Sequence, residues 1–136
     1  MRRLLFCSGR VYYELNTARE ARGAYDVAIV RVEQLSPFPY QEVRDEMLCW
    51  PNAQLVWAQE EAMNYGAWSY VRPRLENTAR SLLRASEGSL AGQAKPREIA
   101  YVGRNPSAAP ATGLVALHQQ ELRELLEAAF ADSAFT

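Results

Sequence analysis

Short apolar runs alternate with segments of helical periodicity along this chain, and the alternation occurs four times. The apolar runs cover residues 4–7, 27–32, 54–59 and 99–102, and the helical segments cover residues 11–22, 40–50, 66–84 and 114–130. The second run is nearly continuous in apolar character, which is typical of a strand buried on both faces of a sheet. The pattern predicts an α/β fold in three layers, with a mostly parallel sheet and helices on both of its faces.

Two segments modify this pattern. Pro73 lies inside the third helical segment, where it should kink or restart the helix because proline has no amide proton to donate. Residues 85–97 follow that helix without any periodicity, and we expect them to form a mobile surface loop.

The last helical segment has the clearest apolar stripe. Its members are Leu114, His118, Leu122, Leu125 and Ala129. Since this spacing places one face of a helix against a partner, we expect His118, the only histidine, to be a core or interface residue. That position argues against His118 as a catalytic base.

Length and charge narrow the class of protein. The 136 residues suit one domain over residues 1–136 and are too few for two. The 15 basic and 16 acidic residues leave a net charge of −1, which argues against nucleic acid and a charged membrane surface as partners. No apolar stretch approaches the ~20 residues of a membrane helix. The chain begins almost within its first strand and lacks a signal or transit peptide, so we expect a fragment of a longer multidomain chain.

The two cysteines show no metal-binding or redox spacing. Cys7 and Cys49 are far apart and lie among apolar neighbours, which predicts buried thiols in a reducing compartment. With a single histidine, a zinc site would need both cysteines, so we predict no metal ligand in this chain.

A parallel sheet binds ligands beyond the carboxyl ends of its strands. The candidate residues after the first and fourth predicted strands are Ser8, Gly9, Arg10, Arg104, Asn105 and Ser107. Gly9 would let the backbone approach a phosphate, and Arg10 and Arg104 could clamp its oxygens. These residues predict an anion or nucleotide effector site, provided that the two strands lie close together. The alternatives are ordinary solvated loops, or a pairing of Arg104 with Glu33 or Glu60.

No self-sufficient active site is evident. The glycines of a dinucleotide-binding fingerprint and of a phosphate-binding loop are missing. Glu60 and Glu61 are adjacent, so they point to opposite sides of an extended chain and cannot act as a pair.

Aromatic residues gather around the end of the third predicted strand, at Trp57, Tyr65, Trp68 and Tyr70. Such a cluster is typical of a core or a subunit interface. We predict a dimer interface here that is formed by Gln59, Glu60, Asn64, Tyr65, Gly66 and Trp68. In that case Trp68→Ala would weaken dimerisation; the alternative is that the aromatics fill the domain's own core.

Five ordered motifs carry a family resemblance. They are CSGRVYYEL at 7–15, RVEQLSPFP at 31–39, WAQEEAMNYGAWSYVRPRL at 57–75, YVGRNPSAAPATG at 101–113 and HQQE at 118–121. Together they resemble the C-terminal domain of the thiamine-diphosphate-dependent first component of the 2-oxoglutarate dehydrogenase complex, over nearly the whole chain. Ala62 departs from the proline usual in that family, and residues 85–97 look long. The related 2-oxoadipate dehydrogenase shares several motifs, but the intact GRNPSAAPATG run favours 2-oxoglutarate.

The resemblance implies a transketolase-like C-terminal domain that completes a homodimer with the rest of its own chain. The full-length oxidoreductase would decarboxylate 2-oxoglutarate and pass the succinyl group to lipoamide, within a multienzyme complex that includes dihydrolipoyl succinyltransferase and dihydrolipoyl dehydrogenase. Thiamine diphosphate and magnesium would bind upstream domains, so we expect no catalytic residue, no bound cofactor and no activity in this chain alone. Adenine nucleotides or acetyl-coenzyme A would be effectors, and the compartment would be the mitochondrial matrix or the bacterial cytoplasm.

Three other interpretations stay open at this point. The chain could be the corresponding domain of 2-oxoadipate dehydrogenase, a free-standing nucleotide- or effector-binding module, or a dimerisation domain that has no ligand. An open reading frame that continues several hundred codons upstream would exclude the free-standing module.

Overall fold

The computed structural model describes residues 1–85, 96–109 and 113–132. Strands and helices alternate in the order β1 (Arg3–Cys7), α1 (Val11–Arg22), β2 (Val27–Arg31), α2 (Tyr40–Cys49), β3 (Gln54–Ala62), α3 (Trp68–Ala85), β4 (Ile99–Arg104) and α4 (Val115–Phe130). The predicted fourfold alternation is confirmed. None of the helices in the described residues is long and apolar enough to cross a membrane.

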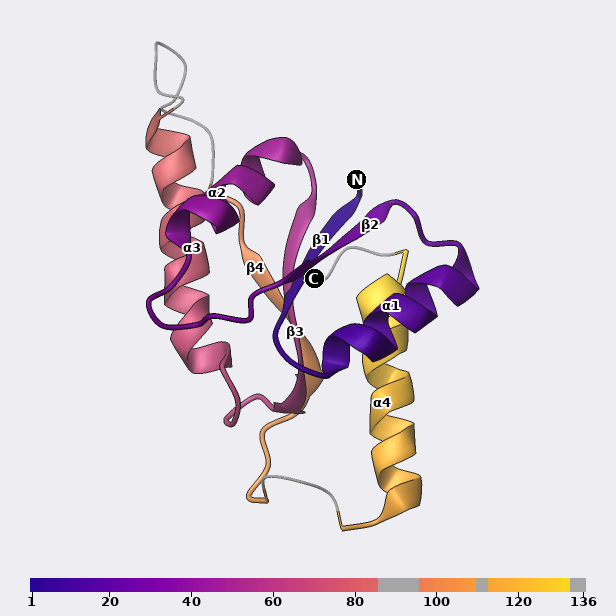
Figure 1. Ribbon diagram of the computed structural model, residues 1–136. Helices are drawn as coiled ribbons and strands as arrows, with labels where there is room; N and C mark the ends of the chain where they lie inside the picture. The colour runs from indigo at the N-terminus through magenta and orange to yellow at the C-terminus, as the bar shows by residue number, and fades with distance from the viewer. Residues whose placement is uncertain (86–95, 110–112, 133–136) are drawn as a thin grey trace.

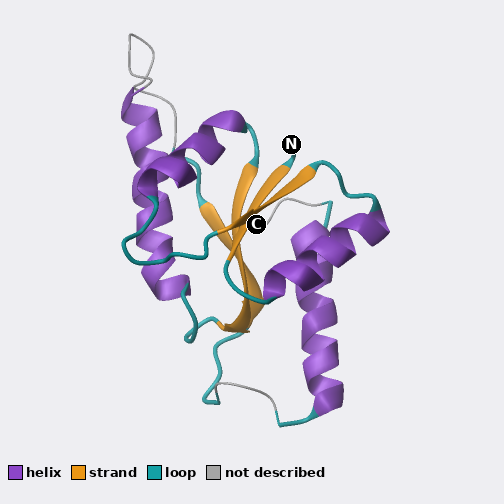
Figure 2. Cartoon of the chain, in the orientation of Figure 1, coloured by secondary structure: helices purple, strands orange, loops and turns teal. Residues whose placement is uncertain are grey.

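The four strands form one parallel sheet in the order β2-β1-β3-β4. Helices α2 and α3 cover one face of the sheet, and α1 and α4 cover the other (Figures 1 and 2). This arrangement confirms the predicted three-layer α/β fold. It also places β3 between β1 and β4, which sequence alone did not determine.

β1 is one of the two inner strands, and its alternate side chains lie on opposite faces of the sheet. Leu4 and Phe6 belong to the core beneath α2 and α3, whereas Leu5 and Cys7 belong to the core beneath α1 and α4. All four are completely buried. Burial on both faces explains why β1 lacks the polar alternation of a half-exposed strand.

Two strands run beyond their predicted ends. β3 continues to Ala62 and β4 to Arg104, and these two end residues pair after an irregularity in the ladder. Each extension depends on the partner strand, because strand pairing satisfies the backbone groups of otherwise polar residues. Glu60 and Glu61 therefore lie within a strand, and so does Gly103, rather than in the loops where the sequence pattern placed them.

The third helix does not restart at its proline. α3 runs without interruption from Trp68 to Ala85, with Pro73 inside it. Proline removes a single amide donor near the start of this helix. Most of the predicted mobile loop, residues 86–95, lies outside the described residues. Arg97, at the end of that loop, is held in place, since it donates hydrogen bonds to the carbonyls of Met47 and Trp50 at the end of α2.

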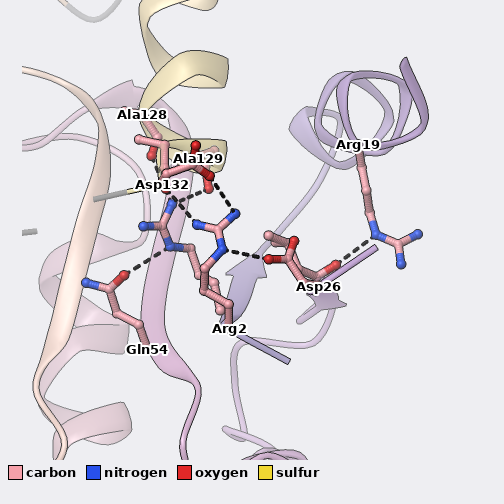
Figure 3. Close-up of polar contacts among 10 residues, drawn as sticks. Arg2, Arg19, Asp26, Gln54, Ala128, Ala129 and Asp132 are labelled. Carbon is pink, nitrogen blue, oxygen red and sulfur yellow. Dashed lines mark hydrogen bonds and ion pairs between the residues drawn. The ribbon is translucent and has the colours of Figure 1, made fainter. Parts of the chain in front are cut away.

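Two arginines join the start of the chain to the end of the last helix (Figure 3). Arg3 is 1% exposed, and its guanidinium donates hydrogen bonds to Gln54 Oε1 (3.0 Å) and to the carbonyls of Ala129 (2.6 Å) and Ala128 (3.2 Å). Arg2 donates to the carbonyl of Ala131 at 2.6 Å. The last carbonyls of a helix have no amide partner within the helix, and they form the negative end of its dipole. We call this pair the arginine clasp of α4.

One of the two predicted buried thiols is exposed. Cys7 is buried in β1, but Cys49 is exposed at the last residue of α2, so the expectation is wrong for Cys49. Burial raises the pKa of the Cys7 thiol to about 12 from an ordinary value of 9.0.

The buried thiol predicts a loss of stability at alkaline pH. Between pH 9 and about 12 the unfolded chain releases the Cys7 proton while the folded chain keeps it. The free energy of unfolding is therefore unaffected below pH 9 and falls as pH rises above it, by about 1.4 kcal/mol for each pH unit. Urea unfolding at pH 8 and pH 10.5 should show this fall in the wild type and in a Cys49→Ala control. The fall should be smaller in Cys7→Ala, and equal falls in all three proteins would contradict the prediction.

Candidate functional site

A cavity of about 510 Å³ lies at the carboxyl edge of the sheet between β1 and β3. The chain leaves β1 toward β2 on one side and leaves β3 toward β4 on the other. The point where the strand order reverses in this way is where open α/β sheets bind ligands. The volume lies within the range of about 300–1,000 Å³ that is usual for small-molecule pockets. We call it the switch-point cavity; its lining is Ser8, Gly9, Leu35, Ser36, Trp57, Gln59, Glu61, Gly66, Ala67 and Tyr70.

The turn between β3 and α3 is organised around Gln59, which is 3% exposed. Its Oε1 accepts hydrogen bonds from the Trp57 indole (3.0 Å) and from the backbone amide of Trp68 (3.0 Å). Its Nε2 donates to the carbonyls of Tyr65 (2.8 Å) and Ala62 (2.9 Å). One amide side chain thus fixes the floor of the cavity and the start of α3. Gln59 was predicted to lie at a dimer interface, but its hydrogen bonds are made within this domain.

The ring of Trp68 packs inside the domain. It is 7% exposed and lies against Tyr101, with ring centroids 5.2 Å apart. The Tyr101 hydroxyl donates to the carbonyl of Arg104 at 2.9 Å, and burial raises its pKa to about 12. The structure thus places Trp68 in the domain's own core, as the alternative interpretation of the aromatic cluster had it.

Glycine is required beside this packing. A Cβ atom at Gly103 would lie 2.4 Å from the Tyr101 hydroxyl oxygen and 2.7 Å from the carbonyl oxygen of Gln59. The second neighbour is backbone, so the sheet itself would have to move.

Asn64, which was predicted to lie at a dimer interface, contacts Ser107, which was predicted to lie in the effector site. Asn64 and Ser107 exchange two hydrogen bonds, from Asn64 Nδ2 to the Ser107 carbonyl (2.7 Å) and from the Ser107 amide to Asn64 Oδ1 (2.9 Å). The Tyr65 hydroxyl donates to the carbonyl of Ala108 at 3.1 Å. The turn after β3 and the loop after β4 therefore form one surface.

The two halves of the predicted effector site are not adjacent. Ser8 and Gly9 line the switch-point cavity, whereas β3 separates their strand from β4. Arg104 forms an ion pair of 2.8 Å with Glu121 of α4, and both side chains are largely buried. Glu121 is a partner that the sequence did not indicate, because the sequence could not show that α4 covers this end of β4. An effector site that uses both loops stays a prediction.

The first turns of α4 leave apolar side chains in solvent. Leu114, Val115 and Leu117 are 69%, 74% and 42% exposed, and His118 is also exposed. Only the second half of the predicted stripe is buried, because α4 begins beyond the carboxyl edge of the sheet (Figure 1). His118 is therefore not a core residue of this domain, and its role at an interface stays a prediction.

The two neighbouring glutamates serve different surfaces. Glu61 lines the switch-point cavity, and Glu60 lines a small cleft against α4 together with His118 and Glu121. They are not a catalytic pair. In the described part of the chain, no three His, Cys, Asp or Glu side chains are grouped so as to hold a metal ion. The residues described here do not fit a magnesium site, and we derive no chemical step from them.

Sequence reasoning missed part of the cavity wall. Leu35 and Ser36 come from the loop between β2 and α2, and they line the cavity together with Ser8 and Gly9, which follow β1. The only available signal was the position of this loop directly after a strand.

Comparisons with known proteins agree on one family. The family described as 2-oxoglutarate dehydrogenase C-terminal matches residues 1–130. The chain is 47% identical over 131 residues to "2-oxoglutarate dehydrogenase, mitochondrial" of Caenorhabditis briggsae, a match that covers 96% of this chain and 12% of the relative. It is 42% identical to the "2-oxoglutarate dehydrogenase E1 component" of Brucella anthropi, over 93% of this chain and 12% of the relative. It is 39% identical to a "Probable 2-oxoadipate dehydrogenase complex component E1 homolog" of Dictyostelium discoideum, over 96% of this chain and 13% of the relative.

Proposed function

This chain belongs to the 2-oxoglutarate dehydrogenase C-terminal family, and on that basis we propose that it serves as the assembly domain of a 2-oxoglutarate dehydrogenase. The chain spans about an eighth of the length of the curated relatives it matches. Most of a full-length enzyme of this kind would therefore lie outside this chain and could contact it. We propose that residues 1–136 act as one transketolase-like unit within that larger protein.

The apolar start of α4 is the observation that supports an assembly role. Leu114 and Val115 are more than two-thirds exposed, and Glu60 lies against the same end of α4. Contiguous exposed apolar side chains with a polar rim mark protein interfaces. We propose that this end of α4, together with the surface formed by Asn64 and Tyr65, contacts the second copy in a homodimer.

Removing the apolar start of α4 should weaken the dimer. In the full-length enzyme, the double change Leu114→Ser and Val115→Ser is expected to cost about 2 kcal/mol or more of dimerisation free energy, as for anchors of a buried interface. Sedimentation equilibrium measures this loss. Leu48→Ser is the matched control, since Leu48 is 54% exposed at the far end of α2. Unchanged dimerisation of the double variant would contradict the proposal. Trp68→Ala is a poor probe, because it removes a core residue.

The activity of the whole enzyme is also a proposal. The full-length protein would decarboxylate 2-oxoglutarate and transfer the succinyl group to lipoamide, with dihydrolipoyl succinyltransferase and dihydrolipoyl dehydrogenase as partners. We propose that thiamine diphosphate and magnesium are held by residues outside this chain. A relative named as mitochondrial and a relative from Brucella, a bacterium, support the mitochondrial matrix or the bacterial cytoplasm as the compartment. Because one relative is named for 2-oxoadipate, the alternative is that the full-length enzyme acts on 2-oxoadipate.

We propose an anionic effector, an adenine nucleotide or acetyl-coenzyme A, at the start of α1. Arg10 is exposed at this helix start, whereas Arg104 is held by Glu121. Titration of the chain with AMP and acetyl-coenzyme A should therefore show saturable binding that Arg10→Ala abolishes. Arg104→Ala should leave binding within about twofold, because its guanidinium faces α4. Absence of saturable binding of either ligand at millimolar concentration and low salt would remove this proposal.

A further inference from the structure

We propose that the switch-point cavity binds a small primary amine that carries an aromatic ring. This inference does not rest on the assembly role or on the effector at Arg10, since neither uses the charged group of this cavity. It rests on the charge, the apolar and aromatic lining and the volume of the cavity.

The charge of the lining favours a cation. Glu61, which is exposed, is the only charged side chain among the described residues that line the cavity. Within the part of the chain that the structure describes, no hydrogen bond or ion pair joins its carboxylate to another group. Arg74 lies 3.6 Å from the centre of the Tyr70 ring but does not line the cavity. An ammonium group would give Glu61 a charge-assisted partner, whereas a phosphate or carboxylate placed here would be repelled.

The walls of the cavity favour an aromatic ring beside that charge. Tyr70 contributes ring surface and Leu35 contributes an apolar side chain, above the indole of Trp57, which is 1% exposed and forms the floor. Aromatic rings stack with other rings and attract cations to their faces. The hydroxyls of Ser8 and Ser36 offer further acceptors for the three donors of an ammonium group.

Gly9 lines the cavity and has open space beside it. This residue has φ of +73°, and a Cβ atom placed on it would meet nothing within 4 Å. No side chain therefore covers the backbone at Gly9. The cavity of about 510 Å³ has ample room for a single ring with a two-carbon amine arm.

Titration with 2-phenylethylamine tests the inference on the purified chain. The indole N–H of Trp57, which donates to Gln59, gives a ¹H–¹⁵N resonance that reports on the cavity floor. We expect a saturable shift of this resonance, while the indole of Trp50, which does not line the cavity, stays unchanged. The matched probe 3-phenylpropionate has the same ring with a carboxylate in place of the ammonium group. It should bind at least about tenfold more weakly.

Two variants of the same strand separate the cavity from general electrostatics. Glu61→Gln should weaken the binding of 2-phenylethylamine about tenfold or more. Glu60→Gln removes the same charge one residue away but on the other face of the sheet, beside α4, and it should change binding less than twofold. Equal effects of the two variants would overturn the proposal. So would equal binding of the amine and the carboxylate, or the absence of a saturable Trp57 shift in the folded wild type.

Discussion

Replacing Gln59 with leucine is expected to lower the free energy of unfolding by about 3–5 kcal/mol. Leucine fills a similar volume but can neither donate nor accept hydrogen bonds. The Trp57 indole and the Trp68 amide would lose their acceptor, and the carbonyl of Tyr65 would lose its donor. The Ala62 carbonyl would keep the backbone amide of Tyr65 as a donor. Each buried group left in this state costs about 1–3 kcal/mol, although relaxation of the turn recovers part of the sum.

Urea unfolding monitored by circular dichroism measures this loss. The matched control is Gln41→Leu, since Gln41 is exposed on α2 and bonds only to Asp45 there; its expected effect is within about 0.5 kcal/mol. A Gln59→Leu variant that loses less than about 1 kcal/mol would show that the hydrogen bonds around Gln59 do not hold the turn.

Removing the buried half of the arginine clasp should cost about 2–4 kcal/mol of unfolding free energy. Arg3→Ala leaves the carbonyls of Ala128 and Ala129 without their donor and opens a cavity beside β1. Arg3→Met restores most of the packing but not the hydrogen bonds, so its loss should be smaller and should report on the cap alone. Burial lowers the pKa of Arg3, which shows that the environment penalises its charge, and the benefit therefore comes from the hydrogen bonds that offset this cost.

Hydrogen exchange gives a local readout of the same change. Amides in the last turn of α4 should exchange faster in Arg3→Ala, since that turn loses its cap. Arg72→Ala is the control, because Arg72 is exposed on α3, where it pairs with Glu76 and lies 5.6 Å from the centre of the Trp68 ring; it should cost less than about 1 kcal/mol. Protection of α4 that is unchanged in Arg3→Ala would contradict the role of the clasp.

The layered fold was predictable because each buried strand carries a continuous apolar run between helical segments. The strand order was not predictable, because the position of β3 between β1 and β4 depends on which helices cover which face. For the same reason the sequence could not show that a strand separates Ser8 from Arg104, which it predicted to share an effector site. The predicted lengths of β3 and β4 were wrong at Glu60 and Gly103. A polar residue or a glycine indicates a loop, but here pairing with the neighbouring strand satisfies the backbone and extends the strand.

The burial of two side chains differs from what residue type and periodicity indicate. Arginine side chains are mostly exposed, yet β1 places Arg3 beside the last carbonyls of α4. The start of α4 shows the opposite case, since Leu114 has the spacing of a core residue and is exposed. Periodicity reports which side chains share a helix face, but not how far the sheet extends beneath that face.

The arginine clasp also sets an order of events during synthesis on the ribosome. The Arg3 guanidinium is bound by carbonyls 125 and 126 residues later in the chain, and the neighbours of β1 in the sheet are also translated after it. β1 is therefore translated before its partner strands and stays unpaired for the longest time. Contacts between such distant residues slow folding, so the nascent domain should remain incomplete, and open to chaperones, until α4 has left the exit tunnel.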